Sequence, residues 1–285
     1  MRTSSECIAC FVNQALTAGA MATKDIKKRE RIMKEAAALA SRHEFTTPPP
    51  YLGKAVQDLV KRVSGNPDPY IHLKKEYNKM ALKAYPRLKK ELGRPGDMLL
   101  HAVKIAITGN VIDFGSAWKF NMHREISRLF HHKPKVFDYA RFKRAFAAAK
   151  SVLYIADNAG ETVFDRVLIE AMKELRRVEV IYAVKERPIL NDTMREDAVY
   201  AGIDKSAKII SSGSGLPGTA VNKKDSSKEF LRIYKSADII IAKGMGNYEL
   251  LDTEKAPVFF MLKAKCPVVA GNLGVELGEM VLKAV

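Results

Sequence analysis

The chain has 285 residues, of which 47% are hydrophobic and 28% are charged, a balance typical of folded proteins that bury a core. It has only three cysteines, an odd number that is too small for a disulfide framework, which argues against a small secreted scaffold. No apolar run resembles a transmembrane span, and the first residues lack the apolar core of a signal peptide. We therefore expect a cytoplasmic protein that does not enter the membrane.

The formal net charge of +16 is confined to the first half of the chain. Residues 1–150 hold 29 of the 48 basic and 13 of the 32 acidic residues, whereas residues 151–285 are neutral overall. A positive charge of this size makes nucleic acid one candidate partner. The basic residues are scattered and carry no interleaved aromatics, which favours solvated helix faces over a nucleic-acid-binding surface. The same charge would also draw anionic substrates toward a pocket.

The first half of the chain has the apolar periodicity of helices. Ile8, Phe11 and Ala15 recur at helical spacing, and the prolines over residues 48–50 break the chain before another helix begins. Further helices are predicted over residues 23–40, 70–92, 95–108, 118–130 and 139–149, with Gly109 as a helix stop. We expect residues 1–149 to form an all-helical N-terminal domain that contributes to the pocket.

The second half alternates short apolar runs with helical segments. Strands are predicted over residues 152–156, 178–184, 208–211, 238–242, 257–262 and 267–270, and helices over 161–175, 193–201 and 226–235. This alternation predicts an α/β domain over residues 150–285, with a Rossmann-like, mostly parallel sheet and helices on both faces.

Polar residues follow five of the predicted strands. Asp157, Asn158 and Glu161 come after the first strand, Asp192 follows the second, and a glycine-rich loop over residues 211–218 follows the third. The fourth strand leads into residues 243–249, and the fifth ends at Lys263. The carboxyl ends of parallel strands form the ligand-binding edge of such sheets, so we expect these groups to converge.

Asp157, Asn158 and Asp192 are hard oxygen donors that suit a divalent metal such as Mg²⁺ or Mn²⁺. An isolated Asp-Asn pair is more often a turn or a helix cap, but Asp192 on the neighbouring strand supplies a converging ligand. Lys243 and Lys263 would neutralise phosphate charge, although most lysines are solvated surface groups.

The glycines around these strand ends leave two interpretations open. Gly160 precedes a helix whose N-terminal amides favour an anion. Gly213, Gly215 and Gly218 would either cradle phosphate or shape a loop.

Taken together, these segments resemble the damage-control phosphatases, a family formerly named domain of unknown function eighty-nine. The matching pieces are residues 157–161 (DNAGE), 191–193 with 196–198, 243–249 (KGMGNYE), 109–113 (GNVID) and the opening Cys7-x-x-Cys10. The resemblance spans nearly the whole chain and implies a helical part followed by a Rossmann-like part.

The resemblance also implies roles for single residues. It implies metal and catalytic roles for Asp157, Asn158 and Asp192. Substrate or phosphate contacts are implied from the segment that holds Lys243, Gly244 and Asn247, and from Lys263. Asn110 and Asp113 are placed beside the pocket. We also expect substrate or phosphate contacts from Glu161, Asn110 and Asp113, and Glu161 would orient water or cap its helix.

The chain departs from part of the family pattern. Many members carry an Arg-Thr-x-Lys sequence that ends at the last lysine, whereas this chain reads Phe260-Met261-Leu262-Lys263 and lacks the Arg and the Thr. The N-terminal Cys-x-x-Cys is typical of the other branch. Cys7 and Cys10 would form half of a zinc site, a redox pair or, by preference, two packed small residues.

The sequence thus predicts a metal-dependent phosphatase that uses Mn²⁺, Ni²⁺, Co²⁺ or Mg²⁺. Its substrates would be phosphomonoesters of small metabolites, damaged or in surplus, such as sugar phosphates or phosphopantetheine-like compounds. One alternative is an S-adenosylmethionine-dependent carboxyl methyltransferase, against which no glycine-rich adenosine loop follows the first strand. The other is a basic nucleic-acid-binding protein.

Overall fold

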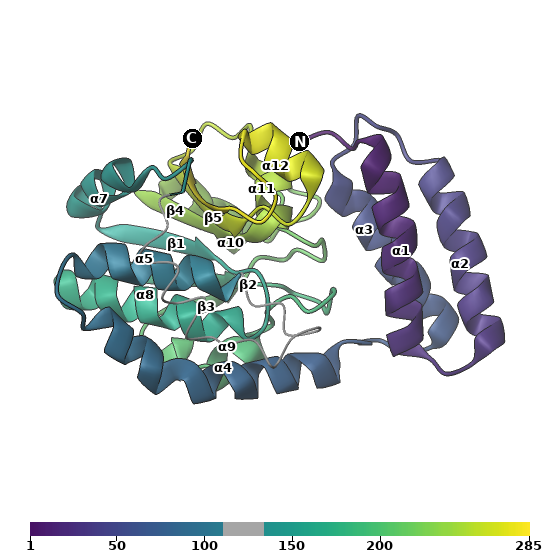
Figure 1. The fold of residues 1–285 in the computed structure, drawn as a ribbon, viewed down its shortest axis with the longest axis horizontal. Helices are drawn as coiled ribbons and strands as arrows, with labels where there is room; N and C mark the ends of the chain where they lie inside the picture. Colours follow the sequence, from purple (N-terminus) through teal and green to yellow (C-terminus); the bar gives the residue numbers. More distant parts are fainter. Residues whose placement is uncertain (111–133) are drawn as a thin grey trace.

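The computed structural model describes residues 1–110 and 134–285, which form a helical part and a six-stranded sheet (Figure 1). The strand order is β3-β2-β1-β4-β5-β6; the first five strands run parallel, and β6 is antiparallel to β5. The strands are β1 (Ser151–Ile155), β2 (Glu179–Val184), β3 (Lys208–Ser211), β4 (Ile239–Lys243), β5 (Val258–Lys263) and β6 (Met280–Ala284). The predicted α/β fold with a mostly parallel sheet is confirmed.

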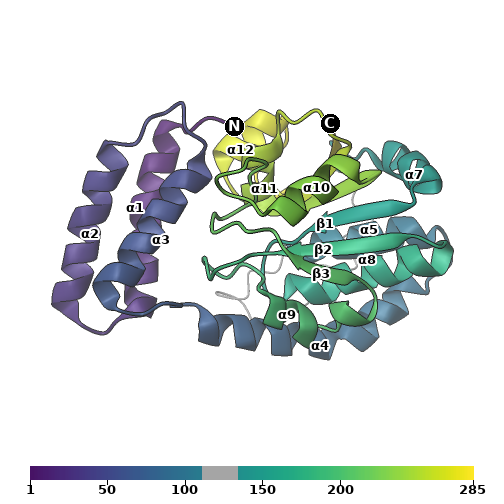
Figure 2. The same cartoon turned by 180° about the vertical axis from the view of Figure 1, so that it is seen from behind.

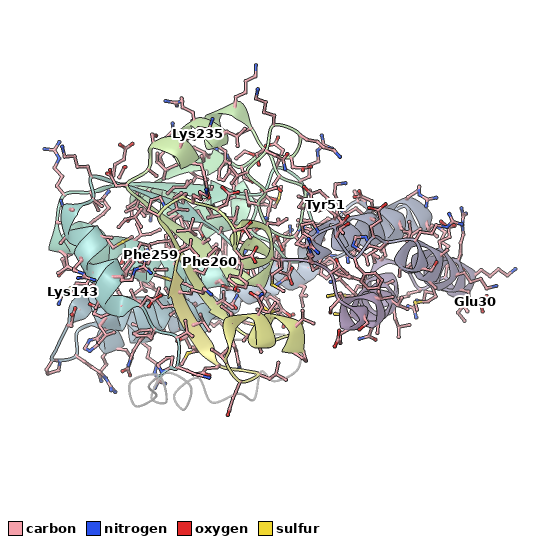
Figure 3. The ribbon with its side chains drawn as sticks, turned by 90° about the horizontal axis from the view of Figure 1, so that it is seen from above. Glu30, Tyr51, Lys143, Lys235, Phe259 and Phe260 are labelled. Atoms are coloured by element: carbon pink, nitrogen blue, oxygen red, sulfur yellow. The ribbon has the colours of Figure 1, made fainter. Side chains whose placement is uncertain are left out.

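Helices cover both faces of the sheet, which is why its strands are apolar on both sides. One face is covered by α4 (Ile71–Leu92), α5 (Met98–Gly109), α7 (Tyr139–Ala148), α8 (Glu161–Leu175) and α9 (Arg195–Tyr200), with a short 3-10 helix η1 (Ile203–Lys205). The other face is covered by α10 (Lys228–Ser236), α11 (Gly244–Leu251) and α12 (Pro267–Leu273). Phe259 and Phe260, neighbours on β5, pack into opposite layers (Figure 3).

Three helices, α1 (Ser5–Ala22), α2 (Ile26–Ser41) and α3 (Pro49–Ser64), pack around an apolar core of their own. They lie beyond the carboxyl ends of the strands (Figures 1 and 2). The Lys61 ammonium donates to the carbonyl of Pro188 in the loop after β2, and Tyr51 donates to Asp225 in the loop after β3. This helical unit therefore contacts the loops that carry the candidate site.

The helices of the predicted N-terminal domain divide between two cores. Helices α4, α5 and α7 share an apolar cluster with the sheet, whereas α1 to α3 share one with each other. The domain boundary between residues 149 and 150 stays a prediction.

Two segments near the C-terminus differ from the prediction. Residues 267–270, predicted as a strand, form the start of α12, so this prediction is wrong. Pro267 has a fixed φ and no backbone N–H, which suits the first turn of a helix, and a run of four apolar residues does not distinguish a helix from a strand. The edge strand β6 was not predicted. The predicted helix over residues 118–130 lies outside the described residues.

None of the helices that the structure describes combines the length and the apolar character needed to cross a membrane. The cytoplasmic location stays a prediction.

Candidate functional site

Backbone contacts join the loops that follow β1 and β2. The amide of Ala159 donates to the carbonyl of Asn191 (2.8 Å), and the amide of Thr193 donates to the carbonyl of Asp157 (2.8 Å). Asn158 and Asp192 form an isolated antiparallel bridge between the two loops. Parallel neighbours β1 and β2 end at the same edge of the sheet, so the structure brings together the three residues predicted as metal ligands.

Two carboxamides hold the carboxylates of this edge. Oδ2 of Asp157 accepts from Nδ2 of Asn110 (2.9 Å) and of Asn158 (2.7 Å). Oε1 of Glu161 accepts from the same two nitrogens, each at 2.8 Å. Oδ1 of Asn110 accepts from the backbone amide of Lys263 at the end of β5 (3.0 Å). Asn110 thus ties the end of α5 to the strand ends, and Asp113 lies outside the described residues.

Negative charge exceeds positive charge among the buried groups at this edge. Four carboxylates lie here, those of Asp157, Glu161, Asp165 and Asp192. They face the ammonium groups of three buried lysines, Lys74, Lys185 and Lys243. Burial, and then the charges of Glu161 and Asp192, hold the pKa of Asp157 well above its ordinary value. Burial also raises the pKa of Asp192 to about 6, although Lys185 acts in the opposite direction. A divalent cation would compensate this excess.

The donor set of the predicted ligands fits a hard cation. Oδ2 of Asp192 is buried, accepts no hydrogen bond from the described residues, and lies 3.5 Å from Nζ of Lys185. The NH₂ group of Asn158 faces Asp157 and Glu161, so its amide oxygen is directed elsewhere. Within residues 1–110 and 134–285, no three histidine, cysteine or carboxylate side chains are arranged to hold a metal ion. The predicted ligands differ from such a group, because one of the three, Asn158, would bind through an amide oxygen.

Lys243 lies beneath this edge with its side chain fully buried. Its Nζ donates to Oδ1 of Asp165 (2.6 Å) and to Oε2 of Glu161 (3.3 Å). Burial acts to lower the pKa of Lys243, but the carboxylates of Asp165 and Glu161 outweigh it and raise this pKa. Lys243 is therefore a charged group with two protein partners, and its predicted contact with phosphate stays a prediction.

The first turn of α11 packs directly on Asp157. Gly244 has a φ of +79°, and a Cβ at this position would lie 2.0 Å from Oδ2 of Asp157. Nδ2 of Asn247 donates to the carbonyls of Lys243 (2.7 Å) and Ala156 (3.1 Å), which ties α11 to the end of β1. The roles predicted for Gly244, Asn247 and Lys263 in substrate binding stay predictions.

Sequence reasoning missed three groups at this edge. Lys185 directly follows β2, as Lys263 ends β5, so the rule applied to the other strand ends would have found it. Asp165 lies one helical turn after Glu161, but its partners come from β1, β2 and β4. Asn78 of α4 accepts from the amide of Gly160 (2.7 Å) and donates to Asp197 (2.7 Å), and no local pattern indicates either contact. The Gly160 amide, predicted to favour an anion, thus has a protein partner.

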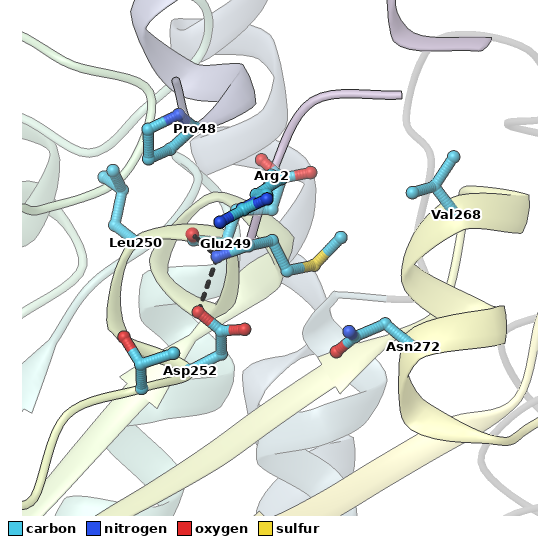
Figure 4. Close-up of a pocket in the computed structure, with 9 residues that line it drawn as sticks. Arg2, Pro48, Glu249, Leu250, Asp252, Val268 and Asn272 are labelled. Carbon is cyan, nitrogen blue, oxygen red and sulfur yellow. Dashed lines mark hydrogen bonds and ion pairs between the residues drawn. The ribbon is translucent and has the colours of Figure 1, made fainter. Parts of the chain in front are cut away.

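Two further parts of the predicted motifs are the cysteines and Glu249. The three cysteines have free thiols, with Cys7 buried and Cys10 exposed. Glu249, which ends the predicted 243–249 segment, lines a separate hollow of about 670 Å³ near the C-terminal end of α11 (Figure 4). There the amino group of Met1 forms an ion pair with Asp252 (2.6 Å).

Comparison with known sequences places the chain in a family. The sequence profile of the damage-control phosphatase ARMT1-like domain matches residues 3–281. The chain belongs to this family. The family predicted from the sequence motifs is therefore confirmed, whereas the branch indicated by Cys7 and Cys10 stays a prediction.

Relatives of similar length support this assignment. The chain is 37% identical over 284 residues to a damage-control phosphatase of Pyrococcus horikoshii, covering 99% of this chain and 97% of the relative. It is 31% identical over 294 residues to a damage-control phosphatase of Archaeoglobus fulgidus, covering 100% of both. The crystal structure of a DUF89 family protein from Pyrococcus horikoshii matches with a TM-score of 0.91 at 37% identity, covering 100% of this chain and 99% of that chain.

Proposed function

We propose that this protein is a metal-dependent phosphatase that hydrolyses phosphomonoesters of small metabolites. The observation that carries the proposal is the convergence of Asp157, Asn158 and Asp192 in a buried cluster with more carboxylates than lysines. Membership of a family with relatives named damage-control phosphatases supports the same activity. Damaged or surplus compounds, such as sugar phosphates or phosphopantetheine-like molecules, are the proposed substrate class.

Asp157, Asn158 and Asp192 would hold the metal, with Mn²⁺, Ni²⁺, Co²⁺ and Mg²⁺ as candidates. A bound metal would polarise the phosphoryl group and lower the pKa of a water molecule. Asn110 orients the carboxylate of Asp157 for this role, and Lys185 offsets part of the charge of Asp192. Lys263, at the end of β5, is our candidate for a contact with the phosphate.

The direct test is hydrolysis of p-nitrophenyl phosphate with and without each divalent metal. We expect activity that is lost with a chelator, and no measurable activity in Asp157→Ala or Asp192→Ala with the circular dichroism spectrum unchanged. Asp204→Ala is the matched control, because Asp204 is exposed on η1 and away from the strand ends. Full activity in either site variant would overturn the ligand assignment, and metal-independent activity would overturn the proposed chemistry.

The substrate class calls for a second experiment. A panel of sugar phosphates, phosphopantetheine-like compounds and nucleotides, assayed by phosphate release, should show a preference of the wild type for small monoesters. Calorimetry with S-adenosylmethionine tests the methyltransferase alternative, since a methyltransferase must bind this cofactor. Salt-dependent binding to DNA or RNA tests the alternative based on the basic first half.

A further inference from the structure

A buried ion pair between Lys243 and Asp165 lies under the candidate metal site. Both side chains are 0% exposed, and Nζ of Lys243 lies 2.6 Å from Oδ1 of Asp165. Asp165 also accepts from the hydroxyl groups of Tyr154 (2.6 Å) and Tyr182 (2.7 Å). These contacts come from β1, β2, β4 and α8, so the pair is held by the centre of the fold and turned away from solvent.

Glu161 connects this pair to the site. Its Oε2 lies 3.3 Å from Nζ of Lys243, and its Oε1 accepts from Nδ2 of Asn110 and of Asn158. Only 2% of Glu161 is exposed. Each of its oxygens is thus engaged by a protein donor, which is the arrangement expected of a group that orients others.

The orientation of Asn158 depends on these contacts. Its NH₂ group donates to both Asp157 and Glu161, so a carboxamide rotated by half a turn would place its oxygen against two carboxylates. Glu161 in turn needs a cation, because a carboxylate buried beside Asp157 is unfavourable unless a positive charge lies next to it. Lys243 supplies that cation, and Asp165 fixes where its ammonium group lies.

We propose that Asp165, Lys243 and Glu161 act as a positioning unit that sets the carboxamide of Asn158 and the carboxylate of Asp157. Lys243 then works through Glu161, and it does not contact the phosphoryl group. The consequence of this unit for metal binding rests on the proposed function, whereas its contacts are independent of that proposal.

The test compares Lys243→Met, Asp165→Asn and the double variant, with Lys235→Met as the matched control. Lys235 is an exposed lysine of α10 (Figure 3). The affinity for Mn²⁺ alone is measured by calorimetry, and kcat and KM are measured with p-nitrophenyl phosphate. We expect each single variant to weaken the Mn²⁺ affinity by about 10–100-fold and to lower kcat, with KM changed by less than about threefold.

The double variant distinguishes the loss of the whole ion pair from the loss of one of its two charges. Removing Lys243 alone leaves Asp165 as an uncompensated buried carboxylate, whereas removing both charges does not. We therefore expect the double variant to unfold at a higher urea concentration than Lys243→Met. Its Mn²⁺ affinity should stay weakened, because Glu161 lacks its cation in both variants. If Lys243→Met fails to fold, Asp165→Asn, which keeps the lysine, decides the question through its Mn²⁺ affinity.

The opposite role for Lys243 gives a different pattern. A lysine that binds phosphate would raise KM, and the inhibition constant of inorganic phosphate, by about tenfold or more and leave the Mn²⁺ affinity unchanged. Wild-type Mn²⁺ affinity in both single variants would overturn the positioning unit while the proposed function stands. If the wild type binds Mn²⁺ but hydrolyses no ester, the proposed function fails, and the affinities still decide the positioning unit. If the wild type binds none of Mn²⁺, Ni²⁺, Co²⁺ and Mg²⁺, both proposals are overturned.

Discussion

Replacing Gly244 by alanine tests how closely α11 constrains Asp157. The added Cβ would lie 2.0 Å from Oδ2 of Asp157, whereas real Cβ contacts essentially never fall under 3.0 Å. The carboxylate must therefore move by about 1 Å. Asn110 and Asn158 both donate to this oxygen, so the movement breaks contacts that orient the predicted metal ligand.

The Gly244→Ala variant should show two effects, one on stability and one on activity. The positive φ of Gly244 costs alanine about 1–2 kcal/mol, which lowers the melting temperature by roughly 2–4 °C per kcal/mol in a protein of this size. Misplacing a reacting group by about 1 Å lowers activity by about 100-fold. Thermal unfolding and Mn²⁺-dependent hydrolysis of p-nitrophenyl phosphate measure the two contributions separately.

Gly65→Ala supplies the matched control. Gly65 ends α3 with a φ of +80°, and none of the described residues lies within 4 Å of the position that an alanine Cβ would take there. This variant should lose the same backbone contribution to stability and keep its activity. Wild-type activity in Gly244→Ala, with a stability loss equal to that of Gly65→Ala, would refute the close constraint on Asp157.

Two further predictions concern pH and the helical unit. Mn²⁺ affinity should fall by at least about tenfold per pH unit below pH 6, because the pKa of Asp192 is raised to about 6, the pKa of Asp157 is also raised, and a protonated carboxyl does not bind metal. Calorimetry between pH 5 and 7.5 would show a flat profile if this is wrong. In the metal-free protein, the same raised pKa means that the Asp192 contribution to stability is present at about pH 4 and is lost as the pH rises through 6. Tyr51→Phe removes a 2.8 Å hydrogen bond to Asp225 and should lower the free energy of unfolding by about 1 kcal/mol in urea without changing Mn²⁺ affinity. Tyr200→Phe, on an exposed ring, should change neither quantity, and a Tyr51→Phe variant as stable as this control would contradict the prediction.

Much of the sheet and the placement of its polar ends followed from the sequence by itself. Residues 208–211 form β3 as predicted, and residues 161–175 form α8, because their apolar patterns have the period of a strand and of a helix. Once the strands are parallel, their carboxyl ends share one edge, so Asp157 and Asp192 were expected to meet. Local pattern and a topological rule were sufficient for both results.

Only the tertiary structure decided where the side chains at that edge are directed. Lys243 and Lys263 both end parallel strands, yet the ammonium group of Lys243 is directed inward to Asp165, a residue 78 positions earlier in the chain. The partner of the Gly160 amide is Asn78, 82 positions away. Spacing along the chain specifies which edge of the sheet a residue reaches, but its partners there come from distant elements that only packing brings into contact.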